Sequence, residues 1–290
     1  MRVDLPQGTL EYARTGRGRP VVFLHGFGQD HRLWQPLVDE LSGEFTCIAP
    51  DLPLGAHRAA MAPDADLTFP GQARLVSDLL QALDLTEVTL VGNDTGGATA
   101  QVVAARHPER LARLVLTGCE TSGNFPPSPF TGLILAARLH AVRPLMAGMR
   151  VRALRRLPSA YGWLTTGELP HDLIDDWLDA YRSDAGVRRD ARKVLCGFRD
   201  RRLLDDVAAE LSHFDRPTLL AWPTDDRLFP YEHAHRLTAL LPQARLAPVP
   251  GSRTWVMRDQ PALLAELIRD FVRETSPRSR ERVDGGPAGP

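Results

Sequence analysis

Short apolar runs and longer amphipathic segments alternate along the chain up to Glu120. Buried strands are predicted over residues 20–24 and 45–49, and helices, from apolar residues at helical spacing, over 31–41 and 69–83. Residues 2–14 favour a pair of antiparallel strands. The two glycines of 16–18 predict a hairpin turn directly after these strands in the sequence. This order of elements predicts an α/β fold with a mostly parallel sheet flanked by helices.

The alternation then stops. Residues 124–129, with the sequence Asn-Phe-Pro-Pro-Ser-Pro, break regular structure, and from about 131 to 211 the segments are typical of helices. Strand patterns return at 218–222 and 244–249, and a last helix is predicted over 261–273. The helical stretch therefore interrupts an otherwise alternating chain.

This interruption predicts the domain organisation. Residues 1–120 and 212–275 are expected to form the core, and residues 121–211 an inserted helical cap. Such an insertion is expected over the carboxyl ends of the strands, where sheets of this kind bind ligands. Residues 276–290 are rich in proline, glycine and charge, so we expect a disordered tail there.

The strongest chemical signal follows the apolar run 88–91. Residues 92–97 read Gly-Asn-Asp-Thr-Gly-Gly, and a helix-forming stretch comes next. A strand that enters a Gly-x-nucleophile-x-Gly turn and leaves as a helix is a nucleophile elbow, in which small flanking residues permit a tight, strained turn. The central residue here is Asp94. Because a carboxylate nucleophile attacks saturated carbon and leaves an alkyl ester, epoxides and alkyl halides are expected substrates ahead of acyl esters.

With this elbow the chain resembles the Asp-nucleophile branch of the α/β-hydrolase fold superfamily, which contains haloalkane dehalogenases, fluoroacetate dehalogenases and epoxide hydrolases. The resemblance covers roughly residues 10–275 and is weakest in the predicted cap. The motif His-Gly-Phe-Gly at 25–28 resembles the family's oxyanion loop. The resemblance implies that the backbone N–H groups of Phe27 and Thr95 stabilise developing negative charge.

Two later motifs resemble the segments that carry the acid and the base of the family's catalytic triad. By its spacing, the segment 222–230 assigns the supporting acid to Asp226, while Glu120, at the end of the strand after the elbow, is an alternative acid. In the segment 250–261 the family's histidine position falls on Thr254. A threonine hydroxyl is not basic, and the missing proton transfer is typically worth 10²–10⁴-fold in rate.

The missing histidine leaves several interpretations open. The leading hypothesis is a cofactor-free hydrolase of small organic molecules with Asp94 as nucleophile, in which another histidine supplies the base. The candidate histidines are His31, His57, His140, His171, His233 and His235. Alternatively, Asp94 acts as a general base in an elimination, isomerisation or cyclisation, with its pKa raised by apolar surroundings. The third interpretation is a protein that binds its ligand without catalysis.

Aromatic residues supply the candidates for substrate binding, namely Tyr161, Tyr181, Trp163 and Trp255. Epoxide hydrolases use two cap tyrosines to hydrogen-bond the epoxide oxygen, and the residues from Tyr181 onward loosely resemble their Tyr-Arg-Asn motif. Dehalogenases commonly place a tryptophan directly after the nucleophile, where this chain has Thr95. The resemblance therefore ranks epoxides slightly above alkyl halides.

Composition narrows the set of partners. The net charge is −1, from 35 basic and 36 acidic residues, which gives no reason to expect nucleic acid. The three cysteines lack metal-ligand spacing, so reduced thiols and no metal site are expected. No apolar run approaches the ~18 residues that cross a membrane, and the first residues lack a signal-peptide pattern. We expect a cytoplasmic protein with a small-molecule substrate, no membrane partner and no cofactor.

Overall fold

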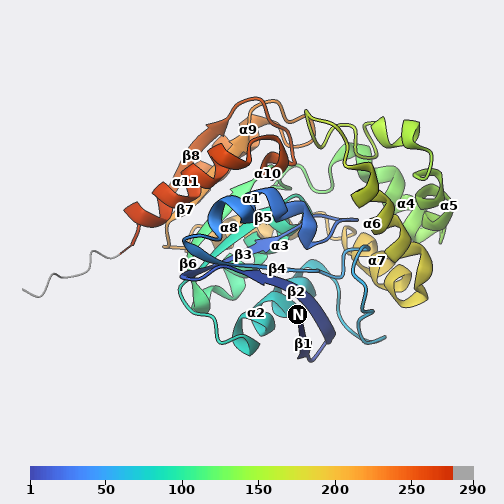
Figure 1. Cartoon of the computed structure of the whole chain (residues 1–290), viewed down its shortest axis with the longest axis horizontal. Helices are drawn as coiled ribbons and strands as arrows, with labels where there is room; N and C mark the ends of the chain where they lie inside the picture. Colours follow the sequence, from blue (N-terminus) through green and yellow to red (C-terminus); the bar gives the residue numbers. More distant parts are fainter. Residues whose placement is uncertain (277–290) are drawn as a thin grey trace, which may run out of the picture.

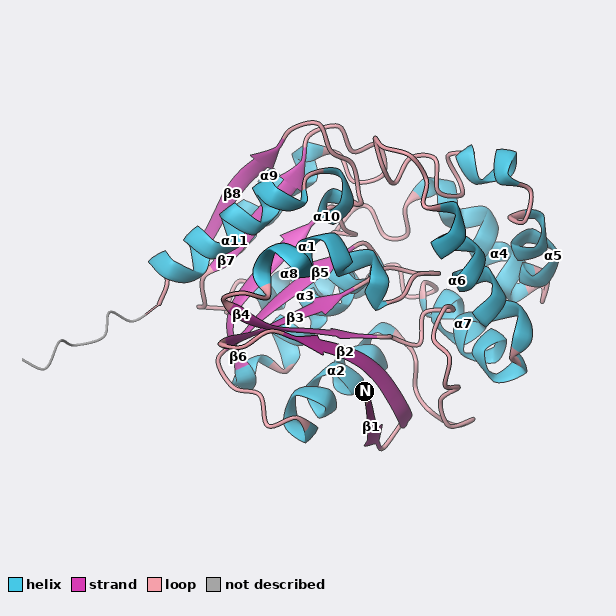
Figure 2. Cartoon of the chain, in the orientation of Figure 1, coloured by secondary structure: helices cyan, strands magenta, loops and turns pink. Residues whose placement is uncertain are grey.

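The computed structural model describes residues 1–276 and is built around an eight-stranded sheet (Figures 1 and 2). The strands are β1 (Arg2–Leu5), β2 (Gly8–Thr15), β3 (Arg19–Leu24), β4 (Phe45–Pro50), β5 (Val88–Asn93), β6 (Leu111–Thr117), β7 (Thr218–Pro223) and β8 (Ala244–Val249). They lie in the order β1-β2-β4-β3-β5-β6-β7-β8, and from β4 to β8 all neighbours are parallel. The predicted α/β fold with a mostly parallel sheet is confirmed.

Helices cover both faces of this sheet, which explains why β4, β5 and β7 are buried at every position. The helices of the core are α1 (Gln35–Leu41), α2 (Phe69–Ala82), α3 (Thr95–Arg106), α8 (Leu203–Leu211), α9 (Tyr231–Leu240), α10 (Val256–Asp259) and α11 (Pro261–Glu274). Helix α1 packs with α10 and α11, and α3 packs between α2 and α8. Continuous apolar strands are the expected sequence signature of a sheet covered in this way.

The predicted hairpin turn at residues 16–18 is wrong. Strand β2 pairs with β4, and β3 lies beyond β4, so the turn joins two strands that are not neighbours. The residues from Val21 to Leu24 are fully buried, and a strand with no exposed face belongs inside the sheet, not next to its edge. Gly16 has a φ of +85°, and a Cβ there would lie 2.2 Å from the carbonyl oxygen of Phe45.

Between β6 and β7 the described chain forms helices and no strand. These are α4 (Thr131–Arg138), α5 (Val142–Gly148), α6 (His171–Ser183) and α7 (Ala185–Gly197), followed by α8, with short 3-10 turns at Ser128–Phe130 and Arg152–Arg156. Figure 1 shows α4 to α7 grouped at one end of the sheet. Helix α8, which ends the predicted insertion, packs against α3 of the core.

The strand order places a topological switch between β3 and β5. From β3 the chain crosses to β4 on one side, and the next strand, β5, lies on the other side of β3. The loops that leave the carboxyl ends of β3 and β5 therefore diverge, and ligands of open α/β sheets bind in the crevice between such loops. The helices α4 to α7 lie over this end of the sheet (Figure 2).

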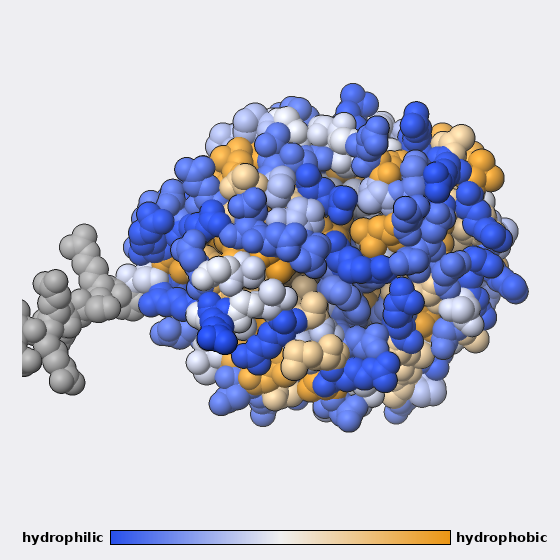
Figure 3. Space-filling model, in the orientation of Figure 1, coloured by the Kyte–Doolittle hydropathy of each residue, from blue (hydrophilic) through white to orange (hydrophobic). Residues whose placement is uncertain are grey.

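Two further observations concern the surface and the end of the chain. On the face shown in Figure 3, hydrophobic side chains form small groups among hydrophilic ones. Within residues 1–276, no helix is long and apolar enough to cross a membrane. The disordered tail predicted for residues 276–290 lies, apart from its first residue, outside the described residues.

Candidate active site

The elbow is present at the carboxyl end of β5. Asp94 follows the strand with φ +52° and ψ −136°, and α3 begins at the next residue. A positive φ is unfavourable for a residue with a Cβ, so the surrounding contacts must hold it. The N–H of Asp94 donates to the carbonyl of Gly118 (2.9 Å). A Cβ on Gly96 would lie 2.2 Å from the carbonyl oxygen of Leu24, so a glycine is required where the start of α3 approaches β3.

The carboxylate of Asp94 rests against the loop that follows β3. Its Oδ1 accepts from the backbone N–H of Thr95 (2.8 Å) and from the Thr95 hydroxyl (3.3 Å), and Oδ2 accepts from Nε2 of Gln29 (3.4 Å). A Cβ on Gly26 would lie 2.4 Å from Oδ2. Burial raises the pKa of Asp94 to about 6, because the charged form loses its hydration.

Only one of the two predicted oxyanion donors contacts Asp94. The Thr95 N–H does so, whereas within the described chain the Phe27 N–H makes no hydrogen bond to this carboxylate. The Phe27 side chain lines the same cavity as Asp94. His25, at the start of the loop, accepts the N–H of Leu52 at Nε2 (2.9 Å), and burial lowers its pKa. This histidine is neutral and holds the loop in place.

A cavity of about 320 Å³ opens at Asp94. Its polar lining comes mainly from Asp94, Thr95, Glu120 and Tyr161, and the rest is predominantly apolar. The apolar lining includes Phe130, Leu133, Ile134, Met146, Met149, Leu164, Leu195 and Phe198, from the helices and loops between β6 and β7. A small organic molecule with few polar atoms fits this combination.

Tyr161, in the segment between β6 and β7, also lines this cavity. The hydroxyl lies 3.9 Å from the position of a Cβ on Gly28, in the loop after β3. The ring packs on Trp177 and Trp255, with centroids 6.4 and 5.9 Å away. Burial raises the pKa of Tyr161 to about 12, so the hydroxyl remains protonated at neutral pH and is a hydrogen-bond donor.

Asp226 and Thr254 form a closed pair at the ends of β7 and β8. The Thr254 hydroxyl lies 3.1 and 3.0 Å from the two carboxylate oxygens of Asp226. Oδ1 of Asp226 also accepts the N–H groups of Leu228 (2.8 Å) and Phe229 (3.1 Å), and burial raises its pKa to about 7. Thr254 thus contacts the acid where the resemblance expects a histidine, but neither residue lines the cavity.

No histidine replaces the missing one. All nine histidines fall within the described residues, and none lines the cavity at Asp94. His31 pairs with Asp51 (2.7 Å), and His57 is buried against Asp190 (3.3 Å). The structure therefore does not favour the interpretation in which another histidine completes a triad.

The comparisons with known proteins agree with this architecture. The family model described as alpha/beta hydrolase fold matches residues 19–258. The chain belongs to the α/β hydrolase fold family. A 2-hydroxy-6-oxo-6-phenylhexa-2,4-dienoate hydrolase from Burkholderia cepacia is 28% identical over 270 residues, which cover 89% of this chain and 88% of that protein. Together with this family, such hydrolase relatives show a hydrolase-type enzyme.

Two other similar proteins carry different chemistry. A cis-3-alkyl-4-alkyloxetan-2-one decarboxylase from Shewanella oneidensis is 26% identical over 279 residues, covering 92% of this chain and 86% of the relative. The solved structure of an epoxide hydrolase, CorEH, superposes with a TM-score of 0.78 and 18% identity, covering 95% of this chain and 99% of CorEH. At that identity the superposition shows a shared fold and no more.

Three of the predicted substrate-binding residues do not line the cavity of this α/β hydrolase. Tyr181 is buried on α6, near the charges of Arg143 and Arg188. Trp163 lies under the guanidinium of Arg227, 6.0 Å from the ring centroid. Trp255 is fully buried behind Tyr161. These aromatic side chains pack against other parts of the fold, so the structure does not bring them to Asp94.

Glu120 does reach the cavity, from the segment directly after β6. Its Oε1 lies 3.4 Å from the Thr95 hydroxyl, and its backbone carbonyl accepts Nε2 of Gln101 (2.7 Å). Oε2 is buried and has no hydrogen-bond partner among the described residues. Burial, together with the charge of Asp94, raises the pKa of Glu120 well above its usual range.

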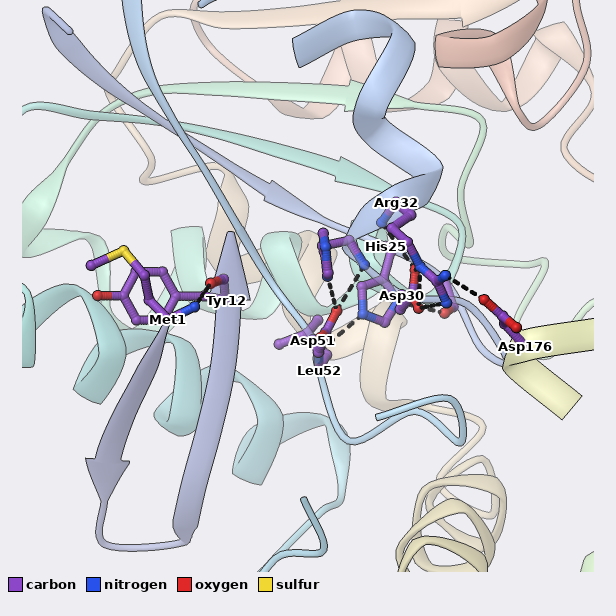
Figure 4. A network of polar contacts seen from close by, with 10 residues as sticks. Met1, Tyr12, His25, Asp30, Arg32, Asp51, Leu52 and Asp176 are labelled. Carbon is purple, nitrogen blue, oxygen red and sulfur yellow. Dashed lines mark hydrogen bonds and ion pairs between the residues drawn. The ribbon is translucent and has the colours of Figure 1, made fainter. Parts of the chain in front are cut away.

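Another group of polar residues lies at the start of α1 (Figure 4). Asp30, His31 and Asp51 place ligand atoms close enough together to surround a metal ion. The charges of this group are already paired, because Arg32 binds Asp30 and Asp176 and His31 binds Asp51. None of these residues lines the cavity at Asp94. The arrangement is that of an ion-pair network that fixes the loop after β3 against α6.

Proposed function

We propose that this enzyme hydrolyses small apolar epoxides, with Asp94 as the nucleophile. The observation that carries the proposal is the placement of a buried carboxylate and a protonated phenol in one apolar cavity. The carboxylate comes from the elbow, and the phenol, Tyr161, comes from the segment between β6 and β7. An epoxide needs these two groups, because one attacks the ring carbon while the other donates to the ring oxygen.

The contacts of Asp94 assign its two oxygens different tasks. Oδ1 is held by the Thr95 N–H, while Oδ2 has only the long contact to Gln29. Oδ2 is therefore the freer oxygen, and it attacks a ring carbon as the carbon–oxygen bond of the epoxide breaks. Tyr161 gives its proton to the resulting alkoxide and regains one from the solvent. The product of this step is a hydroxyalkyl ester of Asp94.

The lining favours epoxides over alkyl halides. A departing halide needs N–H donors in place of water, and no tryptophan, asparagine or glutamine lines this cavity. Thr95 stands directly after the nucleophile, and the nearby tryptophans are packed elsewhere. A single phenolic hydroxyl matches the single oxygen of an epoxide ring.

Intact-protein mass spectrometry during single turnover tests the proposal. We expect a panel of aliphatic and aryl epoxides to add their full mass to the wild-type chain, and Asp94→Asn to prevent the adduct. Tyr161→Phe is expected to slow adduct formation on the order of 10²-fold, because the alkoxide then lacks its proton donor. An adduct that forms equally in Asp94→Asn, or product formed with no Asp94 ester under rapid quench, contradicts the proposal.

A second candidate reaction is favoured by the absence of a histidine from the cavity lining. The Shewanella relative is named as an oxetanone decarboxylase. In such a reaction Asp94 would attack the ring carbon that bears the oxygen and open the lactone to a carboxylate. Loss of CO₂ then breaks the ester bond, forms an alkene and frees Asp94, with no activated water. Incubation with a dialkyl oxetanone distinguishes the two: an alkene and CO₂ support this candidate, and a hydroxy acid excludes it.

A further inference from the structure

We propose that Glu120 is the base that activates water to hydrolyse the ester of Asp94. The inference rests on the proposed function, because it assigns the step that follows ring opening. In this proposal the nucleophile and the base are two carboxyl groups, Asp94 and Glu120, which both contact Thr95. Related enzymes are expected to use a histidine as the base. The resemblance of the sequence suggested Glu120 only as an alternative supporting acid, which is a different role.

The geometry places Glu120 beside the bond that must be hydrolysed. Strands β5 and β6 are parallel neighbours, with Gly92 and Asn93 opposite Leu116 and Thr117, so their carboxyl ends emerge side by side. Asp94 and Glu120 follow those ends and line one cavity. The Thr95 hydroxyl joins them, at 3.3 Å from Asp94 Oδ1 and 3.4 Å from Glu120 Oε1.

The second oxygen of the Glu120 carboxyl group, Oε2, is unsatisfied by the described residues. Oε2 is buried and has no hydrogen-bond partner within residues 1–276. A buried oxygen of this kind is unfavourable unless a water or a substrate group satisfies it. Glu120 lines the same cavity as Asp94, so we place the attacking water between this carboxyl group and the ester.

The other titratable groups that line the cavity do not act as bases. They are Asp94, which is the esterified residue itself, and Tyr161. Burial keeps the Tyr161 phenol protonated, so it donates a proton. Cys119 is adjacent to Glu120 but does not line the cavity, and burial raises its thiol pKa. The Asp226 carboxylate is closed off by Thr254 and two backbone N–H groups.

Ester formation itself prepares Glu120 for this role. A threonine hydroxyl has one proton, so it cannot donate to both carboxyl groups at once. The contact between Thr95 and Glu120 is a hydrogen bond when Glu120 carries a proton and donates to the Thr95 oxygen. A protonated Glu120 agrees with the charge of Asp94, which raises the pKa of Glu120. Esterification removes that charge, and with it one cause of the raised pKa. Glu120 then ionises, and the proton it loses balances the proton taken up by the epoxide alkoxide.

The hydrolytic step balances with these groups alone. Glu120 takes a proton from water as the water oxygen bonds to Cγ of Asp94. Negative charge develops on Oδ1, where the Thr95 N–H donates (2.8 Å). The bond between Cγ and the ester oxygen breaks, and the departing diol oxygen takes the proton from Glu120. Asp94 is released as the carboxylic acid and passes its proton to Glu120, so that both carboxyl groups regain their starting states.

Rapid-quench mass spectrometry of Glu120→Gln with an epoxide tests the inference. We expect the Asp94 ester to form at nearly the wild-type rate and to persist, with steady turnover reduced on the order of 10²–10⁴-fold. Asp226→Asn is the contrast variant, since Asp226 does not line the cavity, and the Asp94 ester of this variant is expected to decay as in the wild type. Persistence of the ester in Asp226→Asn but not in Glu120→Gln overturns the inference, as does full turnover by Glu120→Gln.

A second measurement uses the unaltered chain and does not depend on how the variant folds. We expect multiple turnovers in H₂¹⁸O to place label in the Asp94 carboxyl group, because water attacks Cγ. The decay of the trapped ester is expected to slow as Glu120 is protonated at low pH. Decay that does not change with pH, while label still enters Asp94, overturns the role of Glu120. Absence of both ester and label instead refutes the proposed function.

Discussion

Replacing Asp94 by asparagine is predicted to stabilise the fold at alkaline pH while it removes the nucleophile. Burial raises the pKa of this carboxyl from 3.8 to about 6. At about 1.4 kcal/mol per pH unit, this corresponds to about 3 kcal/mol of unfavourable free energy in the folded, ionised state. The amide of asparagine carries no charge and still offers an oxygen to the Thr95 N–H. Loss of the Asp94 charge also lowers the pKa of Glu120. Ionised Glu120 is then less unfavourable in the folded state, which stabilises the variant further at alkaline pH.

The sign of the pH dependence follows from linkage. The folded Asp94 binds its proton more tightly than the unfolded one, so wild-type stability falls as the pH rises from about 4 to about 6. The stabilisation by Asp94→Asn is therefore near zero at pH 4 and reaches about 3 kcal/mol above pH 7. For a chain of this size, that difference corresponds to about 5 °C in melting temperature.

Thermal and urea unfolding between pH 4 and pH 8.5 measure this difference directly. Asp225→Asn is the control, because Asp225 is an exposed neighbour of the buried Asp226 and its charge is solvated in both states. That variant is expected to have a melting temperature close to that of the wild type. A melting-temperature difference for Asp94→Asn that is absent at pH 8, or equal at pH 4 and pH 8, would refute the argument from burial.

Three further predictions concern turnover. The rate of Asp94 ester formation is expected to fall about tenfold between pH 7 and pH 5, because protonation removes the nucleophile; a flat profile in quenched-flow mass spectrometry would contradict the assigned pKa. Gly26→Ala is expected to slow ester formation on the order of 10²-fold with little change in circular dichroism, since its Cβ would lie 2.4 Å from Asp94 Oδ2; an unchanged rate would show that the carboxylate relocates freely. Thr254→His is expected to leave ester decay in Glu120→Gln slow, because position 254 does not line the cavity; recovered decay would show that a histidine there reaches the ester.

Much of the core was predictable because its elements have strong local patterns. A buried parallel strand is apolar throughout, and the residues of β4, β5 and β7 show this in the sequence alone. The order of strands in the sheet was not predictable from such patterns. The glycines of 16–18 indicate a turn, but a turn does not specify whether its two strands pair.

The site divides in the same way. Asp94 was predictable because the elbow requires glycines at set positions around it, and the contacts of Gly96 show the reason. Of the two candidate tyrosines, the sequence favoured Tyr181 through its loose resemblance to the Tyr-Arg-Asn motif, and only the packing of the helices between β6 and β7 distinguishes it from Tyr161. Tyr161 lines the cavity, while Tyr181 packs between helices. A weak signal for Glu120 was available, since a charged residue directly after a buried strand beside the elbow emerges at the ligand-binding edge.

The pair formed by Asp226 and Thr254 explains why the base must come from another strand. Thr254 places its hydroxyl on both oxygens of Asp226, and neither residue lines the cavity. In the proposed mechanism, the water that attacks the Asp94 ester is therefore activated from another strand. The end of β6 is the neighbouring position that does border the ester, and it carries Glu120. The pKa of a carboxyl base at that position also changes during the reaction. The negative charge of Asp94 raises this pKa before esterification, and the uncharged ester no longer does so. The pKa of a histidine supported by Asp226 would not depend on the Asp94 charge in this way. Slow ester decay in Glu120→Gln is therefore the observation that distinguishes a Glu120 base from a histidine base.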